Sequence, residues 1–93
     1  MEYNISHNEP ESRFETEVEG KLALVDYRKR DNIFIVTHTE VPEELEGRGI
    51  AAALTKTLLD YVRDNGLKVR PVCPYTKMYI QRHPEYNDIV AGL

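Results

Sequence analysis

The sequence predicts an α+β domain with one α/β-like crossover, its elements following the order β-β-β-α-β-α. Three observations support this prediction. Residues 13–41 hold three runs of strand-forming residues separated by turn residues. Residues 50–62 repeat apolar side chains at helical spacing. A short apolar run at residues 67–72 follows, so we expect an antiparallel meander of three strands joined through a helix to one parallel strand.

The three meander strands differ in how their apolar residues are spaced. Phe14, Thr16 and Val18 alternate with charged residues, which predicts a strand with one face in water. After a Glu-Gly turn, the second strand is apolar at both even and odd positions, so we expect it to be more central. A third strand is expected over residues 32–41. Residues 1–12 are polar and are expected to form a lead-in.

Two helices are expected in the second half of the chain. The first has one apolar stripe and ends at Asn65-Gly66, because glycine suits the left-handed cap. The second runs from Tyr75 to His83 and is stopped by Pro84, and residues 86–90 pack back as a terminal turn. The stripe of the first helix consists of Ile50, Leu54, Leu58, Tyr61 and Val62.

The composition is that of an ordinary globular protein, and we expect residues 1–93 to form a single domain. The chain is 41% hydrophobic and has no apolar run long enough to span a membrane, so we expect a cytoplasmic protein and a monomer. A net charge of −4 argues against a general nucleic-acid binder. Residues 48–82 are nevertheless basic, which suits an anionic ligand. One cysteine and three scattered histidines give little potential for a metal site.

The turn Gly47-Arg48-Gly49 organises the chain around an expected anion site. It leads from the third strand into the first helix, whose initial N–H groups have no internal partner and carry the positive end of the helix dipole. A diphosphate is therefore the expected guest. The dinucleotide-binding fingerprint is not present, because Ala52 stands where its third glycine belongs, and the Gly-Lys-Ser/Thr of a P-loop is absent.

The chain resembles the GNAT superfamily of N-acetyltransferases. Its acetyl-CoA loop has the pattern Arg/Gln-x-x-Gly-x-Gly/Ala, and here Gly47 to Ala51 fit the later positions while Glu46 departs from the first. The resemblance also covers His38 to Leu45 and the stretch from Val72 to Tyr86, which are similar to small single-domain members with a cysteine after the second core strand. It spans about residues 13–90 and implies a minimal GNAT fold without the two acceptor-binding helices of larger members.

The resemblance implies acetyl-CoA as co-substrate and an amine of unknown identity as acceptor. Pantetheine is expected to lie against a strand edge at the point where two core strands splay apart. The diphosphate is expected on the glycine turn. The expected cofactor-binding residues are Thr39, Glu40, Val41, Glu46, Gly47, Arg48, Gly49, Ile50, Ala51 and Cys73.

Three side chains are candidates for catalysis. Cys73 follows the last strand, where its thiolate could carry the acetyl group, contact the cofactor thiol without chemistry, or simply pack. His38 ends the third strand and is expected beside Cys73, either as a base or as an ordinary edge histidine. Tyr79 is expected to protonate the departing CoA thiolate, or to belong to an aromatic stripe with Tyr75.

Two other functions stay open on the sequence alone. The missing acceptor helices are compatible with an acyl-CoA-binding or interaction module with little turnover. The glycine turn is compatible with a regulator that binds another diphosphate. The acidic run at Glu40, Glu43, Glu44 and Glu46 could attract a cationic amine or could be solvated surface.

Overall fold

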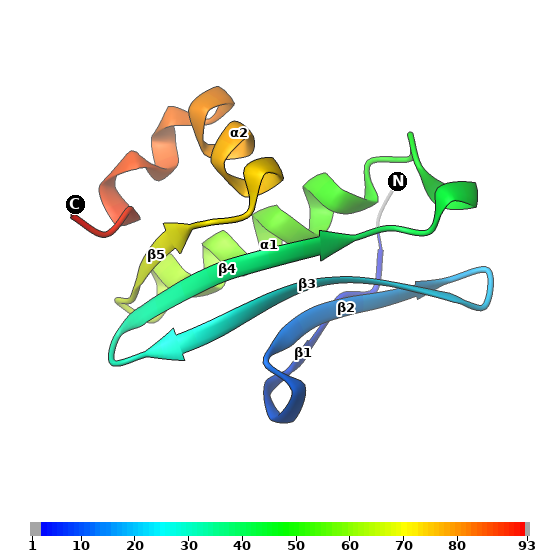
Figure 1. Cartoon of the computed structure of the whole chain (residues 1–93), viewed down its shortest axis with the longest axis horizontal. Coiled ribbons are helices and arrows are strands. Elements are labelled where there is room, and N and C mark those ends of the chain that lie inside the picture. Colours follow the sequence, from blue (N-terminus) through cyan, green and yellow to red (C-terminus); the bar gives the residue numbers. More distant parts are fainter. Residues whose placement is uncertain (1–2, 93) are drawn as a thin grey trace.

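The computed structural model describes residues 3–92 as one mixed sheet with helices packed against it (Figure 1). The strands are β1 (Ser6–Asn8), β2 (Arg13–Val18), β3 (Lys21–Arg30), β4 (Ile33–Glu40) and β5 (Lys68–Pro71). The helices are α1 (Ile50–Asp64), α2 (Pro74–Arg82) and the short 3₁₀ helices η1 (Glu9–Glu11), η2 (Glu43–Leu45) and η3 (Pro84–Ile89). Within this part of the chain, no helix is long and apolar enough to cross a membrane.

The predicted topology is confirmed. The strands lie in the order β1-β2-β3-β4-β5, with antiparallel pairs from β1 to β4 and a parallel pair between β4 and β5. Helix α1 supplies the crossover that a parallel pair requires. It ends where expected, with Gly66 in the left-handed region at φ 66°.

The N-terminal segment is more ordered than its composition predicts. Instead of a polar lead-in throughout residues 1–12, Ser6–Asn8 pair with β2 as an edge strand, and the first two residues lie outside the described part. The ring of His7 stacks on Phe14 with centroids 4.1 Å apart, and its Nε2 lies 2.6 Å from the hydroxyl oxygen of Tyr27. The polar residue His7 thus attaches β1 to the core, and a search of the sequence for apolar strand residues does not detect it.

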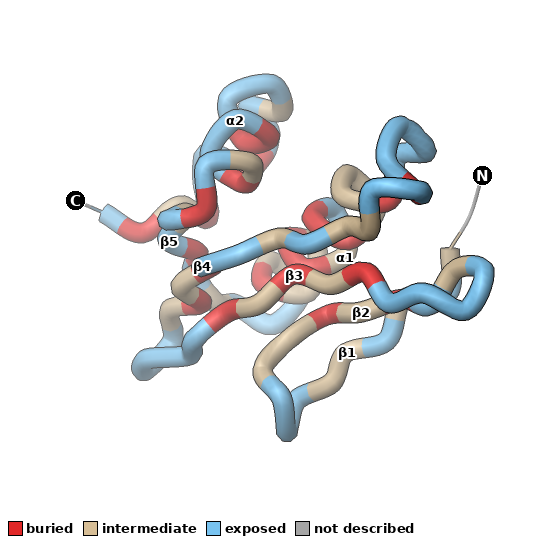
Figure 2. Tube along the Cα trace, turned by 45° about the vertical axis from the view of Figure 1, so that its right-hand side comes forward, coloured by how far each residue is buried: buried red, intermediate tan, exposed pale blue. Residues whose placement is uncertain are grey.

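All the helices that pack on the sheet contribute to one hydrophobic core on one of its faces. The stripe of α1 buries Leu54, Leu58 and Val62 against Val25 and its buried neighbours on the sheet, and α2 and η3 complete the same cluster. Along β3, buried residues alternate with partly buried ones (Figure 2). We call the opposite face of the sheet the open face.

The expected central position of the second strand is confirmed, because β3 is the middle strand of the sheet. Only one of its faces is covered, and Leu22 on the other remains 41% exposed. An antiparallel sheet can leave one face in water, so apolar residues at both even and odd positions of β3 do not require burial of both faces.

A bulge in β4 reverses the direction of its side chains. Asp26 of β3 pairs with His38, but the next residue, Tyr27, pairs with Val36, so Thr37 is an extra residue in β4. Val36 faces the core, and without the bulge His38 would do so as well. Instead, Thr39 shares the core face with its partner Val25, and His38 lies on the open face.

The pairing between β4 and β5 stops just before the bulge. Its last pair is Val36 with Pro71. The N–H groups of Val72 and Cys73 then both donate to the carbonyl of Val36, at 3.0 and 2.9 Å. Beyond this point the edge of β4 that faces away from β3 has no strand partner, so the two strands splay as the resemblance implies.

Core packing predicts the response to truncation of α1. Leu58→Ala should lower the free energy of unfolding by about 3 kcal/mol, because Leu58 is fully buried and the site cannot fully collapse. Leu22→Ala is the matched control on the open face and should cost less than about 1 kcal/mol. Urea denaturation followed by circular dichroism measures both, and equal losses would contradict the one-sided core.

Candidate functional site

A cavity of about 480 Å³ lies between the free edge of β4 and the start of α1. Its size is within the range of ligand-binding pockets. It brings together two segments singled out in the sequence, the end of β4 and the glycine turn. Its walls are formed by Thr39, Glu40, Val41, Leu45, Glu46, Gly47, Gly49, Ile50, Ala51, Ala52 and Tyr75.

One end of the cavity is built from unpaired main-chain donors. Gly49 is the N-cap of α1 and offers no side-chain cap, so the N–H groups of Ile50, Ala51 and Ala52 make no hydrogen bond within the described residues. Gly47 and Gly49 have φ of 85° and 78°, a conformation that other residues adopt only under strain. The buried side chain of Ile50 anchors this first turn. These N–H groups and the helix dipole together form an anion-binding end.

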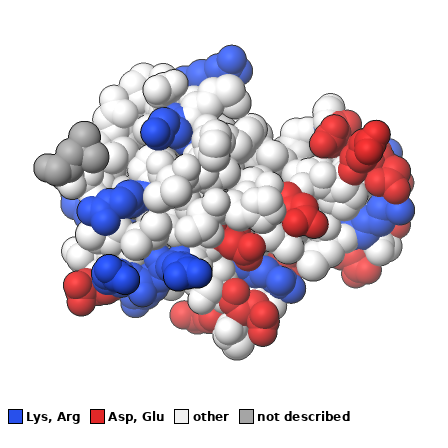
Figure 3. All heavy atoms as spheres, viewed as in Figure 1, with Lys and Arg blue, Asp and Glu red and all other residues white. Residues whose placement is uncertain are grey.

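The side chains around the cavity do not add positive charge. Within residues 3–92, its charged lining residues are Glu40 and Glu46, and no lysine or arginine lines it. Arg48, expected at the phosphate, instead forms an ion pair with Glu19 in the β2–β3 turn, and its carbonyl accepts a hydrogen bond from Tyr3. The lysine and arginine side chains that make residues 48–82 basic therefore do not line the cavity. Figure 3 shows one group of carboxylates near the β4–α1 connection, away from most of the cations.

Cys73 lies beneath the free strand edge as the N-cap of α2, and it is 4% exposed. Its Sγ is 3.5 Å from the Thr39 hydroxyl, which lines the cavity. Burial raises the pKa of the Cys73 thiol, but the Thr39 hydroxyl and the polar groups of Thr76 and Tyr75 close to the sulfur outweigh burial and lower the pKa overall. A lower pKa increases the fraction of the thiolate, which is the nucleophilic form.

Thr76 is a second polar group at the sulfur that the sequence did not reveal. It is fully buried in α2, one helical turn from Cys73, and its hydroxyl has no hydrogen-bond partner of ordinary geometry. Its hydroxyl and N–H both help to lower the pKa of Cys73. The spacing Cys-x-x-Thr at a helix start is the signal that could have indicated it, because N-cap and N3 groups face each other.

His38 does not lie where it was expected. The bulge at Thr37 turns it to the open face, where its side chain is exposed and its Nε2 is 3.2 Å from Glu40 Oε1. Thr39, whose side chain takes the core face instead, provides the contact with Cys73. Strand periodicity alone predicts the opposite assignment, so the expected pairing of His38 with Cys73 is wrong.

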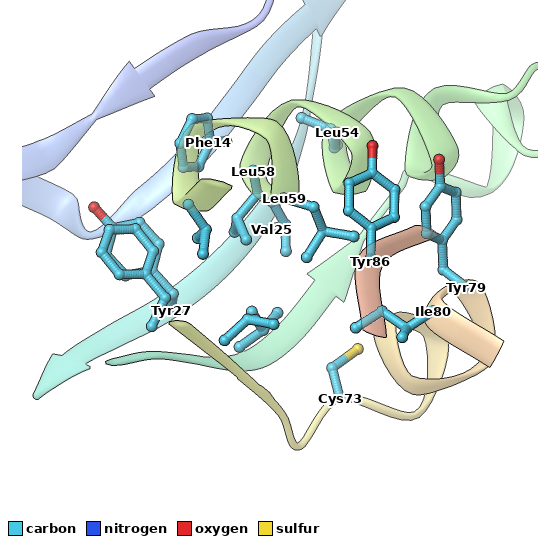
Figure 4. Close-up of a cluster of buried hydrophobic side chains, with 14 of the residues drawn as sticks. Phe14, Val25, Tyr27, Leu54, Leu58, Leu59, Cys73, Tyr79, Ile80 and Tyr86 are labelled. Atoms are coloured by element: carbon cyan, nitrogen blue, oxygen red, sulfur yellow. The ribbon is translucent and has the colours of Figure 1, made fainter. Parts of the chain in front are cut away.

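Tyr79 belongs to an aromatic stack within the helical layer. Its ring stacks on His83 with centroids 4.0 Å apart, and Tyr86 is its neighbour at 6.3 Å. Burial raises the pKa of Tyr79. Figure 4 shows its hydroxyl pointing toward α1 and away from the sulfur of Cys73. Tyr75 rather than Tyr79 lines the cavity.

Among the described residues, no cluster of three His, Cys, Asp or Glu side chains could hold a metal ion. The arrangement that is present combines an anion-binding helix start, a free strand edge and a thiol with a lowered pKa. These parts meet at Thr39, whose main chain belongs to the edge and whose hydroxyl contacts the thiol. Such an arrangement can hold an extended anionic ligand with its far end near a nucleophile.

The hydrogen bonds at Cys73 predict a measurable shift in its reactivity. Its rate of alkylation by iodoacetamide should rise through a midpoint at lower pH than in the urea-unfolded chain, because the folded-state pKa is lowered. Thr39→Val should raise this midpoint, since it removes one donor to the sulfur. Thr37→Val, which changes the same residue type in the bulge, should leave it unchanged. A midpoint in Thr39→Val equal to that of the wild type would show that the hydroxyl does not stabilise the thiolate.

Comparison with known proteins agrees with this geometry. A family model described as GCN5-related N-acetyltransferase matches residues 13–89. Protein NATD1 of Mus musculus is 32% identical over 84 residues, which cover 86% of this chain and 76% of the mouse protein. Protein NATD1 of Danio rerio is 30% identical over 90 residues, covering 90% of this chain and 81% of the fish protein.

A solved structure shares the fold along nearly the whole chain. The solution NMR structure of a GCN5-like protein from Staphylococcus aureus aligns with a TM-score of 0.76 and 30% sequence identity, covering 98% of this chain and 90% of that one. The family match includes the free edge of β4, the glycine turn and Cys73. The chain belongs to the GCN5-related N-acetyltransferase family.

Proposed function

We propose that the protein binds acetyl-CoA in the cavity between β4 and α1 and transfers the acetyl group to an amine through Cys73. The observation that carries the proposal is the continuity of the site, with unpaired helix N–H groups at one end and a thiol of lowered pKa close to the free strand edge. Family membership supports the same reaction class.

Main-chain groups would make most of the contacts with the cofactor. The N–H groups of Ile50, Ala51 and Ala52 suit the diphosphate. The unpaired edge at Thr39 to Val41 suits the amide groups of pantetheine, because both are extended chains of alternating donors and acceptors. Neither contact requires a basic side chain, which agrees with the lining of the cavity.

The transfer would proceed in two balanced steps. The Cys73 thiolate attacks the acetyl carbonyl, and the bond from that carbon to the CoA sulfur breaks, so that CoA leaves as a thiolate. Tyr75 lines the cavity and is better placed than Tyr79 to give this leaving group a proton. A neutral amine would then attack the acetyl carbon on Cys73, the bond from that carbon to the Cys73 sulfur would break to restore the thiolate, and the proton lost by the amine would return to the Tyr75 phenolate. Glu40 and Glu46 at the rim would attract the cationic form of such an amine.

A binding module with little turnover is the second candidate. The low exposure of Cys73 favours it, since an incoming amine would need a path to the sulfur. In this case Cys73 would form the wall of the thioester channel. Acyl-enzyme formation distinguishes the two functions.

Charge at the rim should limit cofactor affinity. Glu46→Gln should tighten the binding of CoA about two- to fivefold, because it removes a negative charge from the wall that the diphosphate approaches. Glu43→Gln removes the same charge from η2, outside the cavity, and should change the affinity less. Titration calorimetry with CoA and with ADP measures both variants. Equal effects of the two substitutions would place the diphosphate elsewhere.

An acetylated enzyme is the expected intermediate. Incubation with acetyl-CoA and no amine should add one acetyl group to Cys73, seen by mass spectrometry of the intact protein and removed by hydroxylamine. Cys73→Ala should lose amine-dependent CoA release and keep its affinity for CoA. Cys73→Ser should lose most of the activity, because a hydroxyl at its normal pKa is a much weaker nucleophile.

The same experiment can reject the carrier role. If no acetylated protein forms and Cys73→Ala releases CoA at a rate within a few-fold of the wild type, the amine attacks acetyl-CoA directly. If neither protein releases CoA with any amine while both bind it, the second candidate stands.

A further inference from the structure

The open face carries a compact group of basic side chains that the cavity does not use. Two adjacent rows cross β3, β4 and β5, and each places an isoleucine of β4 between two cations. The residues between the rows, Phe34 and Val69, are buried toward α1, so the rows face the other side. The first row is Arg30, Ile33 and Lys68, and the second is Arg28, Ile35 and Arg70. We call the four cations the basic ladder.

The basic ladder is exposed and almost free of ion pairs. All four residues are exposed, and none of Arg28, Arg30 and Arg70 forms a salt bridge within residues 3–92. Lys68 donates to the carbonyl of Asp88 at 2.9 Å, which holds its head at the sheet edge. Figure 3 shows basic side chains gathered over the β3–β4 turn and β5 in a protein whose net charge is −4.

This concentration of positive charge lowers the stability of the folded protein. Like charges two residues apart on one strand, and two strands apart across β4, repel one another, and the isoleucines between them are only partly buried. Within the described part of the chain, the carboxylates around the ladder form no ion pair with it. Asp31 lies at the tip of the turn, and Asp26 lies one row further along β3. The carboxylate of Asp88 is paired with Arg63. Such an uncompensated surface fits a partner of opposite charge.

We propose that the basic ladder is a docking surface for an extended acidic segment of a partner protein. Two residues along a strand span ~7 Å, so Arg28 and Arg30 repeat at the spacing of carboxylates at alternate positions of an extended peptide. Lys68 and Arg70 repeat in the same way on β5. The isoleucines between them supply a hydrophobic surface for the methylene groups of the acidic side chains.

The composition of the open face favours a peptide over a nucleic acid. Single-stranded nucleic acids are held by aromatic rings that stack on the bases, and the two rows offer isoleucines instead. Glu15, Glu17 and Glu40 lie at the opposite end of the same face and repel a longer polyanion. The same carboxylates oppose a flat anionic membrane. The proposal is independent of the cofactor, because the ladder and the cavity lie on opposite sides of the bulge.

Binding of a designed peptide tests the proposal. The probe is a capped, fluorescein-labelled peptide of alternating glutamate and threonine, followed by fluorescence anisotropy with the whole chain. Saturable binding with a Kd below about 1 mM is expected, weakening as salt is raised. A matched lysine-threonine peptide should not bind.

Paired variants locate the surface. The double variant Arg28→Gln with Arg70→Gln should raise the Kd about tenfold, because it removes two exposed ion pairs between the protein and the peptide's glutamates. Lys77→Gln with Arg82→Gln removes the same charge from exposed positions of α2 and should change the Kd less than about twofold. Circular dichroism melts check that each variant stays folded. Amide shifts of the wild type on titration should centre on Ile33 and Ile35.

Other results overturn the proposal. These are failure of the peptide to bind, an equal loss in the two double variants, or amide shifts centred elsewhere. Tighter binding of an oligouridine than of the peptide would assign the ladder to nucleic acid. Tighter binding to phosphatidylserine vesicles would assign it to a membrane.

Discussion

The carbonyl of Val36 determines the geometry of the whole site. Two consecutive N–H groups, of Val72 and Cys73, converge on it, and this shared acceptor ends the ladder between β4 and β5. Because β5 turns away there, the last residues of β4 keep an unpaired edge next to the start of α1. The same contact fixes the backbone of Cys73 directly below that edge. A longer parallel pair would fill the gap and leave no cavity.

The bulge at Thr37 decides which side chains meet in the gap. The bulge shifts the alternation of side chains along β4 by one residue. As a result, Thr39 contacts the Cys73 thiol and His38 is exposed to water. The sulfur is therefore surrounded by hydroxyl and N–H donors instead of an imidazole base. Such donors prepare a nucleophile by lowering its pKa, whereas a base would accept its proton during the reaction. A lowered pKa raises the fraction of thiolate at a given pH, which is a different way to activate a cysteine from proton transfer to a neighbouring base.

The sequence predicted most of the fold and the two main-chain segments that line the cavity. Helical periodicity identifies the stripe of α1, and the glycine turn identifies the anion-binding end, because both signals are local. The rest depends on contacts between distant segments. No residue type marks the bulge, and the strand β1 is attached through the polar ring of His7. Glu19, which engages Arg48, belongs to another turn of the sheet.

The two surfaces that we propose to bind anions in this small protein obey different physics. The cavity offers fixed N–H dipoles in a partly enclosed space lined by carboxylates, so it selects a ligand by shape and by the reach of its phosphates. The basic ladder offers exposed cations whose attraction is long in range and screened by salt. The carboxylates that line the cavity lie between the two surfaces, so they repel an anion that moves from the open face toward the cavity. If both proposals hold, the uneven charge along the chain keeps two classes of anionic ligand apart.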